Sequence, residues 1–277
     1  MNLELKLEID EKNFEEGILN ILKTIRSNWD ERDINFKVFS EGITNKLIGT
    51  YCTSVSEMIL FRINGNKTDI LIDRIAEIKN MKLLNRYGFA PKIYATFLNG
   101  ICYEFIPGVI LNTNSVYEPS IWKTIATQMA KMHQIPLTNE QLNCEPMIKR
   151  VGLKYLEMIP EKFTNEAINA RISRLFPSKS ELSAHFSSLL DILCSTNSQI
   201  VFCHNDLLLS NILYTSDTSK ISFIDFEYAE PNWQAFDIGN HFAKMSGASS
   251  DSSIDYSRFP DKDFQMKWLK YYLKGVS

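Results

Sequence analysis

The sequence predicts an α+β protein of two lobes, a small antiparallel β lobe followed by a mainly α-helical lobe. Up to Ile106, short apolar runs are separated by turn residues, which is typical of strands and hairpins. Beyond Pro107-Gly108 the apolar residues recur with the period of an α-helix. We therefore expect an N-terminal lobe over residues 1–106 and a C-terminal lobe over residues 107–277.

Composition excludes several classes of function. The chain has 277 residues, 44% of them hydrophobic and 23% charged, which is typical of a globular protein. Its net charge of -3 gives no basic footprint for nucleic acid. The sequence has no apolar run long enough for a transmembrane helix and no signal peptide at its N-terminus. We therefore expect a cytoplasmic protein that neither inserts into membranes nor binds nucleic acid.

The five cysteines are widely spaced and form no C-x-x-C pair. An odd number without such pairs argues against a disulfide framework and against a zinc site. Cys203 precedes His204, but neighbouring residues of a strand face opposite ways, so a buried structural thiol is expected there.

The first lobe begins with a strand and a helix. Leu3, Leu5, Leu7 and Ile9 alternate with polar residues, which predicts a strand. An amphipathic helix then follows, with Asp10 or Asn13 as its cap.

A hairpin is expected between residues 36 and 51, with a polar, glycine-bearing turn. The turn contains Gly42, Thr44 and Asn45. Such a hairpin can cover nucleotide phosphates, but no G-x-G-x-x-G is present, and an ordinary β-turn would use Gly42 equally well.

The next strand, residues 58–63, carries one charge, Arg62, within an apolar run. A buried arginine without a partner is costly, and the helix that begins near Asp73 offers Glu77. We expect an Arg62–Glu77 ion pair. The alternative is that Arg62 extends to water at a strand edge.

Two further strands, residues 92–97 and 101–106, are joined by Asn99-Gly100, a hairpin signal. Pro107-Gly108 then ends the β pattern. The second lobe is expected to contain helices over residues 119–133, 147–158, 165–175 and 178–194.

The second lobe also contains the stretch around which the chain is organised. Apolar strands near residues 201 and 212, and a third over residues 221–227, are interrupted by polar residues where each strand ends or turns. These residues are His204, Asp206, Asn211, Asp225 and Glu227. The order H-x-D-x-x-x-x-N, followed by Asp-Phe after an apolar strand, is the layout of a kinase catalytic loop and its metal-binding aspartate.

Phosphoryl transfer needs few groups. One carboxylate must orient and accept the proton of the attacking hydroxyl, and oxygen ligands must hold Mg²⁺ on the phosphates. Asp206 suits the first role, and Asn211 and Asp225 suit the second. If the strand continues through Glu227, that side chain points to the side of Asp225 and adds a metal contact. A lone His-x-Asp, by contrast, is usually a surface pair or a loop cap.

Residues 204–213 (HNDLLLSNIL), 223–229 (FIDFEYA) and 234–242 (QAFDIGNHF) resemble the choline/ethanolamine kinase family, which is related to protein kinases and aminoglycoside phosphotransferases. The two leucines after Asp206 resemble the ethanolamine branch. The resemblance implies a protein-kinase-like fold, ATP and Mg²⁺ as cofactors, and phosphorylation of ethanolamine to phosphoethanolamine. In phospholipid biosynthesis that reaction opens the CDP-ethanolamine route to phosphatidylethanolamine.

The resemblance also implies roles for residues outside these motifs. The phosphates would be contacted by Gly42, Thr44 and Asn45 and by Arg62, which Glu77 orients. Residues 104–110 would be the hinge between the lobes, and Glu104 and Ile106 would lie there against the adenine. Asp237 would brace the catalytic loop.

Two departures from the family leave alternatives open. The family usually has Glu near the substrate cation where this chain has Lys244, and family members continue with further helices beyond the equivalent of Ser277. A choline kinase and an inactive, kinase-shaped binding protein therefore stay open beside the ethanolamine kinase. The preference between ethanolamine and choline, and a homodimer, also stay open.

Overall fold

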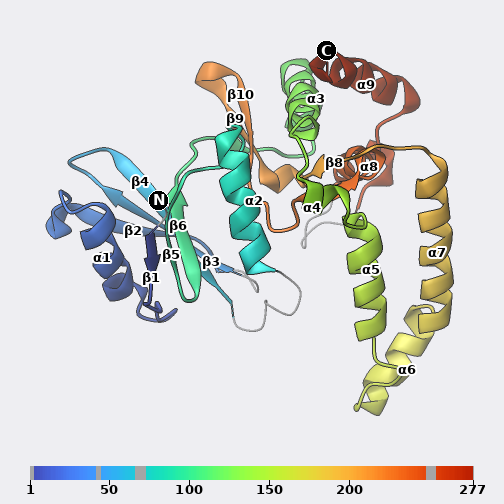
Figure 1. The fold of residues 1–277 in the computed structure, drawn as a ribbon, viewed down its shortest axis with the longest axis horizontal. Coiled ribbons are helices and arrows are strands. Elements are labelled where there is room, and N and C mark those ends of the chain that lie inside the picture. The colour runs from blue at the N-terminus through green and yellow to red at the C-terminus, as the bar shows by residue number, and fades with distance from the viewer. Residues whose placement is uncertain (1–2, 42–44, 66–72, 248–253, 277) are drawn as a thin grey trace. The chain divides into compact units, whose positions relative to one another are not determined.

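The computed structural model describes residues 3–41, 45–65, 73–247 and 254–276, which form two compact units (Figure 1). The first unit comprises residues 1–109 and 213–227, and the second comprises residues 110–212 and 228–277. The segment that bears Asp225 and Glu227 thus groups with the N-terminal part of the chain. Gly42 and Thr44 lie outside the described residues.

The first unit is built on a six-stranded sheet of order β1-β5-β6-β4-β3-β2. Its neighbouring strands are antiparallel, except that β1 runs parallel to β5. The strands are β1 (Leu3–Leu5), β2 (Ile34–Glu41), β3 (Asn45–Cys52), β4 (Glu57–Asn64), β5 (Ile93–Phe97) and β6 (Gly100–Glu104). The predicted hairpin is therefore β2 and β3, while the first strand ends at Leu5, four residues before the predicted end at Ile9.

Helix α1 (Phe14–Ile25) supplies part of the hydrophobic core of this unit (Figure 1). Its buried residues Ile18, Ile21 and Leu22 pack in one cluster with Ile48 of β3 and Phe61 of β4. Burial of such side chains contributes roughly 1.5–3 kcal/mol each. The apolar face expected from the sequence is thus the face that meets the core.

Helix α2 (Arg74–Arg86) begins where the sequence predicts, because the Asp73 side chain caps it. This carboxylate accepts hydrogen bonds from the backbone N–H groups of Ile75 and Ala76, at 3.1 and 3.0 Å. The cap fixes the first turn of α2 and with it Glu77, whose side chain is fully buried.

A small sheet of order β10-β9-β7 contains β7 (Val109–Ile110), β9 (Ile212–Thr215) and β10 (Lys220–Phe223). The strand predicted through Glu227 ends at Phe223, so that expectation was wrong. Asp225 has a φ of 64°, in the left-handed region, which breaks the extended conformation. Asp225 and Glu227 therefore do not share one side of an extended strand.

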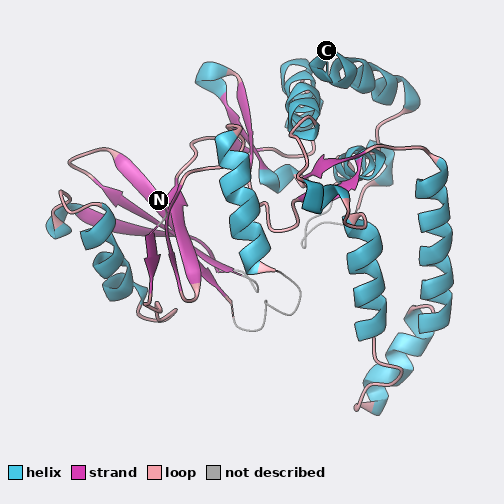
Figure 2. Ribbon diagram, in the orientation of Figure 1, coloured by secondary structure: helices cyan, strands magenta, loops and turns pink. Residues whose placement is uncertain are grey.

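The second unit is mainly helical (Figure 2). Helices α5 and α7 pack against each other, and α6 joins their far ends (Figure 1). Strands β8 and β11 pair antiparallel. The elements are α3 (Pro119–His133), α4 (Asn139–Leu142), α5 (Met147–Met158), α6 (Glu166–Leu175), α7 (Lys179–Ser195), β8 (Ile200–Cys203), β11 (Glu230–Trp233), α8 (Gln234–Lys244) and α9 (Lys262–Val276).

Short 3-10 helices occur in both units, at Glu31–Asp33, Ser115–Tyr117, Leu209–Asn211, Ser216–Thr218 and Tyr256–Arg258.

The contact between α3 and α9 depends on a glycine. A Cβ at Gly275 would lie 2.8 Å from the Cβ of Ala130 and 3.2 Å from the backbone of Thr127. Small residues at this crossing let the two helices approach closely.

Throughout the described part of the chain, no helix is both long and apolar enough to cross a membrane.

Candidate active site

The predicted catalytic loop follows β8 and has a defined conformation. Asp206 is partly buried, and its carbonyl oxygen accepts hydrogen bonds from the backbone N–H of Leu208 at 2.8 Å and from Nδ2 of Asn211 at 3.0 Å. The amide of Asn211 is thereby oriented, with Nδ2 engaged in the loop and Oδ1 left over as an acceptor. The structure thus brings Asp206 and Asn211 together.

Asp237, in the first turn of α8, binds the backbone of this loop. Its Oδ2 accepts the backbone N–H of His204 at 2.9 Å, and its Oδ1 accepts that of Asn205 at 2.8 Å. The side chain is fully buried, so these are charge-assisted hydrogen bonds in the protein interior. Asp237 therefore acts on the loop backbone, as the resemblance implies.

A chain of buried hydrogen bonds fixes Asp237 in turn. Nε2 of His133 lies 3.0 Å from Oδ2 of Asp237, and Nδ1 of His133 lies 2.6 Å from the hydroxyl of Tyr272. Because an ionised carboxylate only accepts, Nε2 donates to Asp237, and Nδ1 shares a hydrogen bond with the hydroxyl of Tyr272. Gln234 donates to the same hydroxyl at 2.9 Å. Helices α3 and α9 thus support the loop through α8.

These contacts determine the charge state of Asp237. Burial raises the pKa of the carboxyl group, but the hydrogen bond and charge of His133, the charge of His204 and the backbone N–H of His204 outweigh it. The pKa of Asp237 is lowered below the ordinary value of 3.8. The brace is therefore a carboxylate at neutral pH.

Asn205 gives the loop its turn. Its φ of 66° lies in the left-handed region, which asparagine tolerates better than most residues. Its side-chain Nδ2 donates to the carbonyl oxygens of Tyr228 and Glu230 at 2.8 and 3.1 Å, and its Oδ1 accepts from Asn232 at 2.8 Å. The side-chain contacts of Asn205 and the hydrogen bonds to Asp237 consequently fix the backbone that leads into Asp206.

The electrostatic environment of Asp206 includes one cation on α8. Burial raises the pKa of Asp206 above the ordinary value of 3.8, and the charges of Lys244 and, more weakly, His204 oppose that rise. Asp237 adds a small contribution in the direction of burial. A carboxylate with a raised pKa is a stronger base than one in water, which suits a group that accepts a proton.

In the first unit the expected ion pair of Arg62 and Glu77 is present. The two nitrogens of the guanidinium group donate to the two oxygens of Glu77 at 2.6 and 2.7 Å. The side chains are 8% and 0% exposed. The alternative, that Arg62 extends to water at a strand edge, was wrong. Its Nε is buried and has no hydrogen-bond partner among the described residues.

A second arginine extends this pair. Arg74 donates to Oε2 of Glu77 at 3.1 Å and to Oδ1 of Asn45 at 3.0 Å, and it lies 3.4 Å from Oε2 of Glu227. Burial raises the pKa of Glu227, while the charge of Arg74 opposes the rise. Asn45, Glu77 and Glu227, all predicted site residues, are thus joined through Arg74.

Asp225 belongs to the same environment. Burial lowers the pKa of Arg62, but the charge of Glu77 and, with smaller effects, those of Tyr103 and Asp225 raise it above its ordinary value. The left-handed φ of 64° at Asp225 costs energy for a residue other than glycine, and such strain is often found at ligand sites. In the first unit the structure thus groups Asn45, Arg62, Glu77, Asp225 and Glu227.

The predicted hinge residues lie at the end of β6. Glu104 is exposed, and its backbone N–H and its carboxylate both contact the main chain of Lys92, at 2.9 and 3.2 Å. Ile106 is partly buried. Between them, the ring of Phe105 stacks on that of Phe39 in β2, with centroids 6.1 Å apart. The segment that follows β6 is therefore in contact with the hairpin of β2 and β3.

The residues predicted to hold Mg²⁺ carry oxygen donors of the kind that this ion prefers. The carboxylate of Asp225 and Oδ1 of Asn211 are the hard donors that this ion prefers. Glu227 also offers a carboxylate, but it shares this group with Arg74. Another group of potential ligands, His133, Cys203 and Asp237, is fully buried. Because His133 and Asp237 already hydrogen-bond each other, we assign that group a structural role.

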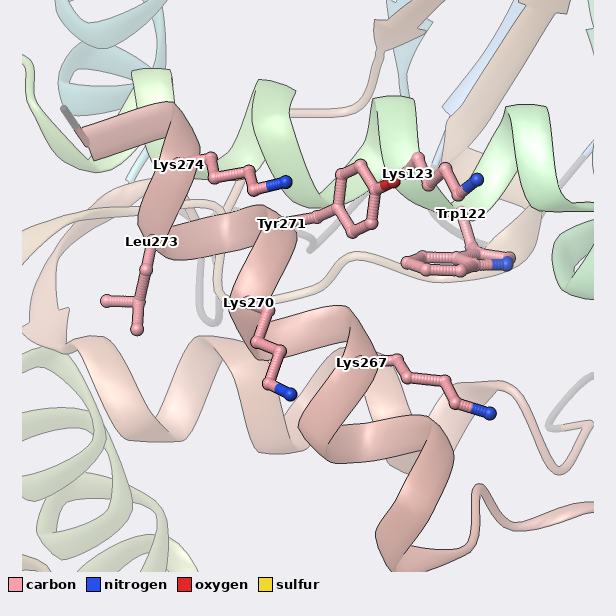
Figure 3. A pocket seen from close by; sticks show the side chains of 7 residues that line it. All are labelled: Trp122, Lys123, Lys267, Lys270, Tyr271, Leu273 and Lys274. Carbon is pink, nitrogen blue, oxygen red and sulfur yellow. The ribbon is translucent and has the colours of Figure 1, made fainter.

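A cavity of about 590 Å³ is lined by residues of α3 and α9, which are not among the predicted site residues (Figure 3). Four of its seven lining residues are lysines. Figure 3 shows the rings of Trp122 and Tyr271 and the chain of Lys123 close together at its edge. Cation–π contacts at 5.2 and 4.8 Å hold Lys123 and Lys274 on the ring of Tyr271.

Three contributors were not predicted from the sequence. Arg74 stands in the first turn of a helix, where the dipole disfavours a cation, and that conflict could have identified it. Asn205 could have been suspected as the residue between His204 and Asp206 that must turn the chain. His133, by contrast, gave no signal, because its partner Asp237 lies 104 positions away.

Comparisons with known proteins identify the family of the chain. The family model described as choline/ethanolamine kinase matches residues 36–277. Ethanolamine kinase 1 of Homo sapiens is 41% identical over 267 residues, which is 96% of this chain and 58% of the relative. A probable ethanolamine kinase of Nematostella vectensis is 40% identical and covers 99% of this chain, which spans 77% of its length.

Among solved structures, a Plasmodium vivax ethanolamine kinase superimposes with a TM-score of 0.84. It is 29% identical, and the match covers 96% of this chain and 74% of that one. The fold is therefore α+β and kinase-like. The chain spans only 58% of the length of its human relative, so it matches the larger part of that protein and not the whole.

Proposed function

The chain belongs to the choline/ethanolamine kinase family, and on this basis we propose that it transfers the γ-phosphoryl group of ATP to the hydroxyl of ethanolamine. The relatives at 40–41% identity bear the name ethanolamine kinase, which supports ethanolamine as the acceptor. The product, phosphoethanolamine, would enter the CDP-ethanolamine route to phosphatidylethanolamine. The cytoplasm is the proposed location.

The observation that carries the proposal is the way the loop holds Asp206. The carboxylate is partly buried, its pKa is raised, and its backbone is fixed by Asn211 and by neighbours that Asp237 holds. A fixed base of this kind can orient an alcohol and accept its proton. As the hydroxyl oxygen bonds to the γ-phosphorus, the bond to the bridging oxygen breaks, its electron pair leaves with ADP, and the proton passes to Asp206.

The remaining predicted residues are assigned to Mg²⁺ and ATP. Asn211, Asp225 and Glu227 would hold Mg²⁺, which when bound neutralises charge on the phosphates. The phosphates would be contacted by Arg62, which Glu77 holds in a bidentate pair, and by the turn of the hairpin at Gly42, Thr44 and Asn45. Glu104 and Ile106 would line the adenine at the hinge.

Transfer of the labelled γ-phosphate of ATP to a panel of small alcohols tests this function. The panel contains ethanolamine, choline and an uncharged alcohol of similar size. The proposal expects Mg²⁺-dependent transfer with the highest kcat/KM for ethanolamine. A higher value for choline would make the chain a choline kinase. If no acceptor is phosphorylated, and nucleotide still raises the melting temperature, the chain is instead a kinase-shaped binding protein.

A further inference from the structure

One face of α8 contacts the backbone of the catalytic loop. Asp237 on this face binds the backbone of His204 and Asn205, and Nδ1 of His241 lies 3.5 Å from the carbonyl oxygen of Leu207. The two residues are four positions apart, so they share one side of the helix. Lys244 comes three positions after His241 and lies on the same side.

The position of Lys244 on α8 favours a side chain that points towards the loop. Side chains on an α-helix lean towards its N-terminus, which here means towards His241 and Leu207. Among the charges that act on Asp206, that of Lys244 has the largest effect. Lys244 is partly buried, and none of the described carboxylates lies within ion-pair distance of it. Lys244 is therefore a cation on this face of α8 whose charge acts on the proposed base and which has no ion-pair partner among the described residues.

The charge of Lys244 does not help Asp206 as a base. A nearby cation favours the ionised form of a carboxylate and so weakens its affinity for a proton. Nor does it help to bind a substrate ammonium. At a separation of about 6 Å and an effective dielectric constant of ~20, like-charge repulsion weakens the affinity roughly a hundredfold.

The third group that must come to Asp206 is the transferred phosphoryl group. It has to lie in line with the hydroxyl oxygen, at about 3–3.5 Å in a reactive geometry. Its three peripheral oxygens carry the negative charge that a lysine stabilises during the transfer. The long, flexible chain of lysine can deliver an ammonium group to such a position.

On the basis of the proposed function, we propose that Lys244 is a further catalytic residue, which binds the peripheral oxygens of the phosphoryl group during transfer. The same charge disfavours an acceptor with a cation close to its hydroxyl. Lys244 thus contributes to kcat and simultaneously weakens the binding of a cationic acceptor.

The test compares Lys244→Met with the wild-type chain and with Lys244→Arg, which keeps the charge. Lys267→Met, an exposed lysine of α9, is the matched control. We expect Lys244→Met to lower kcat roughly a hundredfold, the effect of removing one transition-state donor, and to lower or leave unchanged the KM for ethanolamine. Lys244→Arg should restore part of kcat, and Lys267→Met should behave as the wild type does.

ATP hydrolysis without an acceptor provides a second readout that needs no amino alcohol. If Lys244 binds the phosphoryl group, Lys244→Met lowers this rate too. An unchanged kcat, or a lowered KM with unchanged kcat, would overturn the inference and leave the proposed function intact. A wild-type chain that transfers no phosphoryl group to ethanolamine or to water would overturn the proposed function and the inference together.

Discussion

Glu77 is a buried acid whose two oxygens are both held by arginines. Arg62 binds the carboxylate in a bidentate pair at 2.6 and 2.7 Å, and Arg74 adds a contact at 3.1 Å. Such a pair gains little over an apolar pair, but the loss of one partner leaves a charge in the protein interior. The site thus depends on all three charges being present.

The variant Glu77→Gln should therefore be strongly destabilised. It leaves Arg62 buried without a counter-charge, and we expect a loss of about 3 kcal/mol in the free energy of unfolding. Urea denaturation measures this loss. Glu145→Gln is the control, because Glu145 pairs with Lys149 on an exposed helix surface and its loss should not be measurable. An equal loss of unfolding free energy in both variants would show that the buried ion pair of Glu77 contributes no more to stability than the exposed pair of Glu145.

Backbone conformation singles out two site residues. Asn205 and Asp225 have φ values of 66° and 64°, one directly before the proposed base and the other at the proposed metal ligand. Each such conformation costs of order 1–3 kcal/mol and persists only when its surroundings enforce it. For Asn205 the enforcing contacts are the side-chain hydrogen bonds to Tyr228, Glu230 and Asn232.

At the scale of elements, α8 connects the catalytic loop to the helical packing of its unit. One side of the helix carries Asp237 and His241, which contact the loop backbone, and Lys244, whose charge acts on Asp206. His241 is buried, and burial lowers its pKa to about 4, so it is neutral at physiological pH. The charges on this side at neutral pH are thus the carboxylate of Asp237 and the ammonium of Lys244.

The carboxylate of Asp237 should make stability depend on pH. Its pKa in the folded chain is below the ordinary value of 3.8, so the unfolded chain binds the proton more readily. The stability that Asp237 contributes is complete above that value and is lost as the pH falls through the lowered pKa. We expect the difference in unfolding free energy between the wild type and Asp237→Asn to be constant near neutral pH and to shrink in acid. A difference that grows in acid would contradict this sign.

The pairing of β4 with β6 requires a glycine. A Cβ at Gly100 would lie 2.1 Å from the carbonyl oxygen of Arg62 and 2.6 Å from the ring of Phe97. Gly100→Ala should therefore separate the strands, with a loss of roughly 1–3 kcal/mol and weaker binding of Mg·ATP through displaced Arg62. Thermal melts and nucleotide titration measure the two effects.

Gly239→Ala is the matched control for that substitution. Gly239 lies within α8, and a Cβ there would meet no atom within 4 Å. Alanine is the better helix former, so this variant should gain about 0.5–1 kcal/mol. Equal losses in both variants would refute the steric explanation for Gly100.

For the whole molecule, local signals predicted most of the fold. The bounds of α3 and α5 agree with the sequence pattern, because Pro119 starts one helix and regular apolar spacing defines both. The strand through Glu227 was predicted wrongly, since alternation cannot reveal that Asp225 adopts a left-handed conformation.

For the site, the sequence predicted groups whose types and spacing are themselves the signal, such as Asp206 and Asn211. It also predicted the Arg62–Glu77 pair, because a charge in an apolar strand demands a partner nearby in the chain. It could not predict the link of Tyr272 and His133 to Asp237. That link joins three helices distant in sequence, and each residue alone has an ordinary structural explanation.

The decisive measurement is transfer of labelled γ-phosphate to ethanolamine by the wild-type chain and by Asp206→Asn, with Mg·ATP affinity measured for both. Asparagine keeps the shape of the side chain but cannot accept the proton. We predict that kcat falls by roughly 10²–10⁴-fold while the affinity for Mg·ATP is unchanged. A variant that transfers phosphate as fast as the wild type, or a wild-type chain that transfers none, would contradict the assignment of Asp206 as the catalytic base.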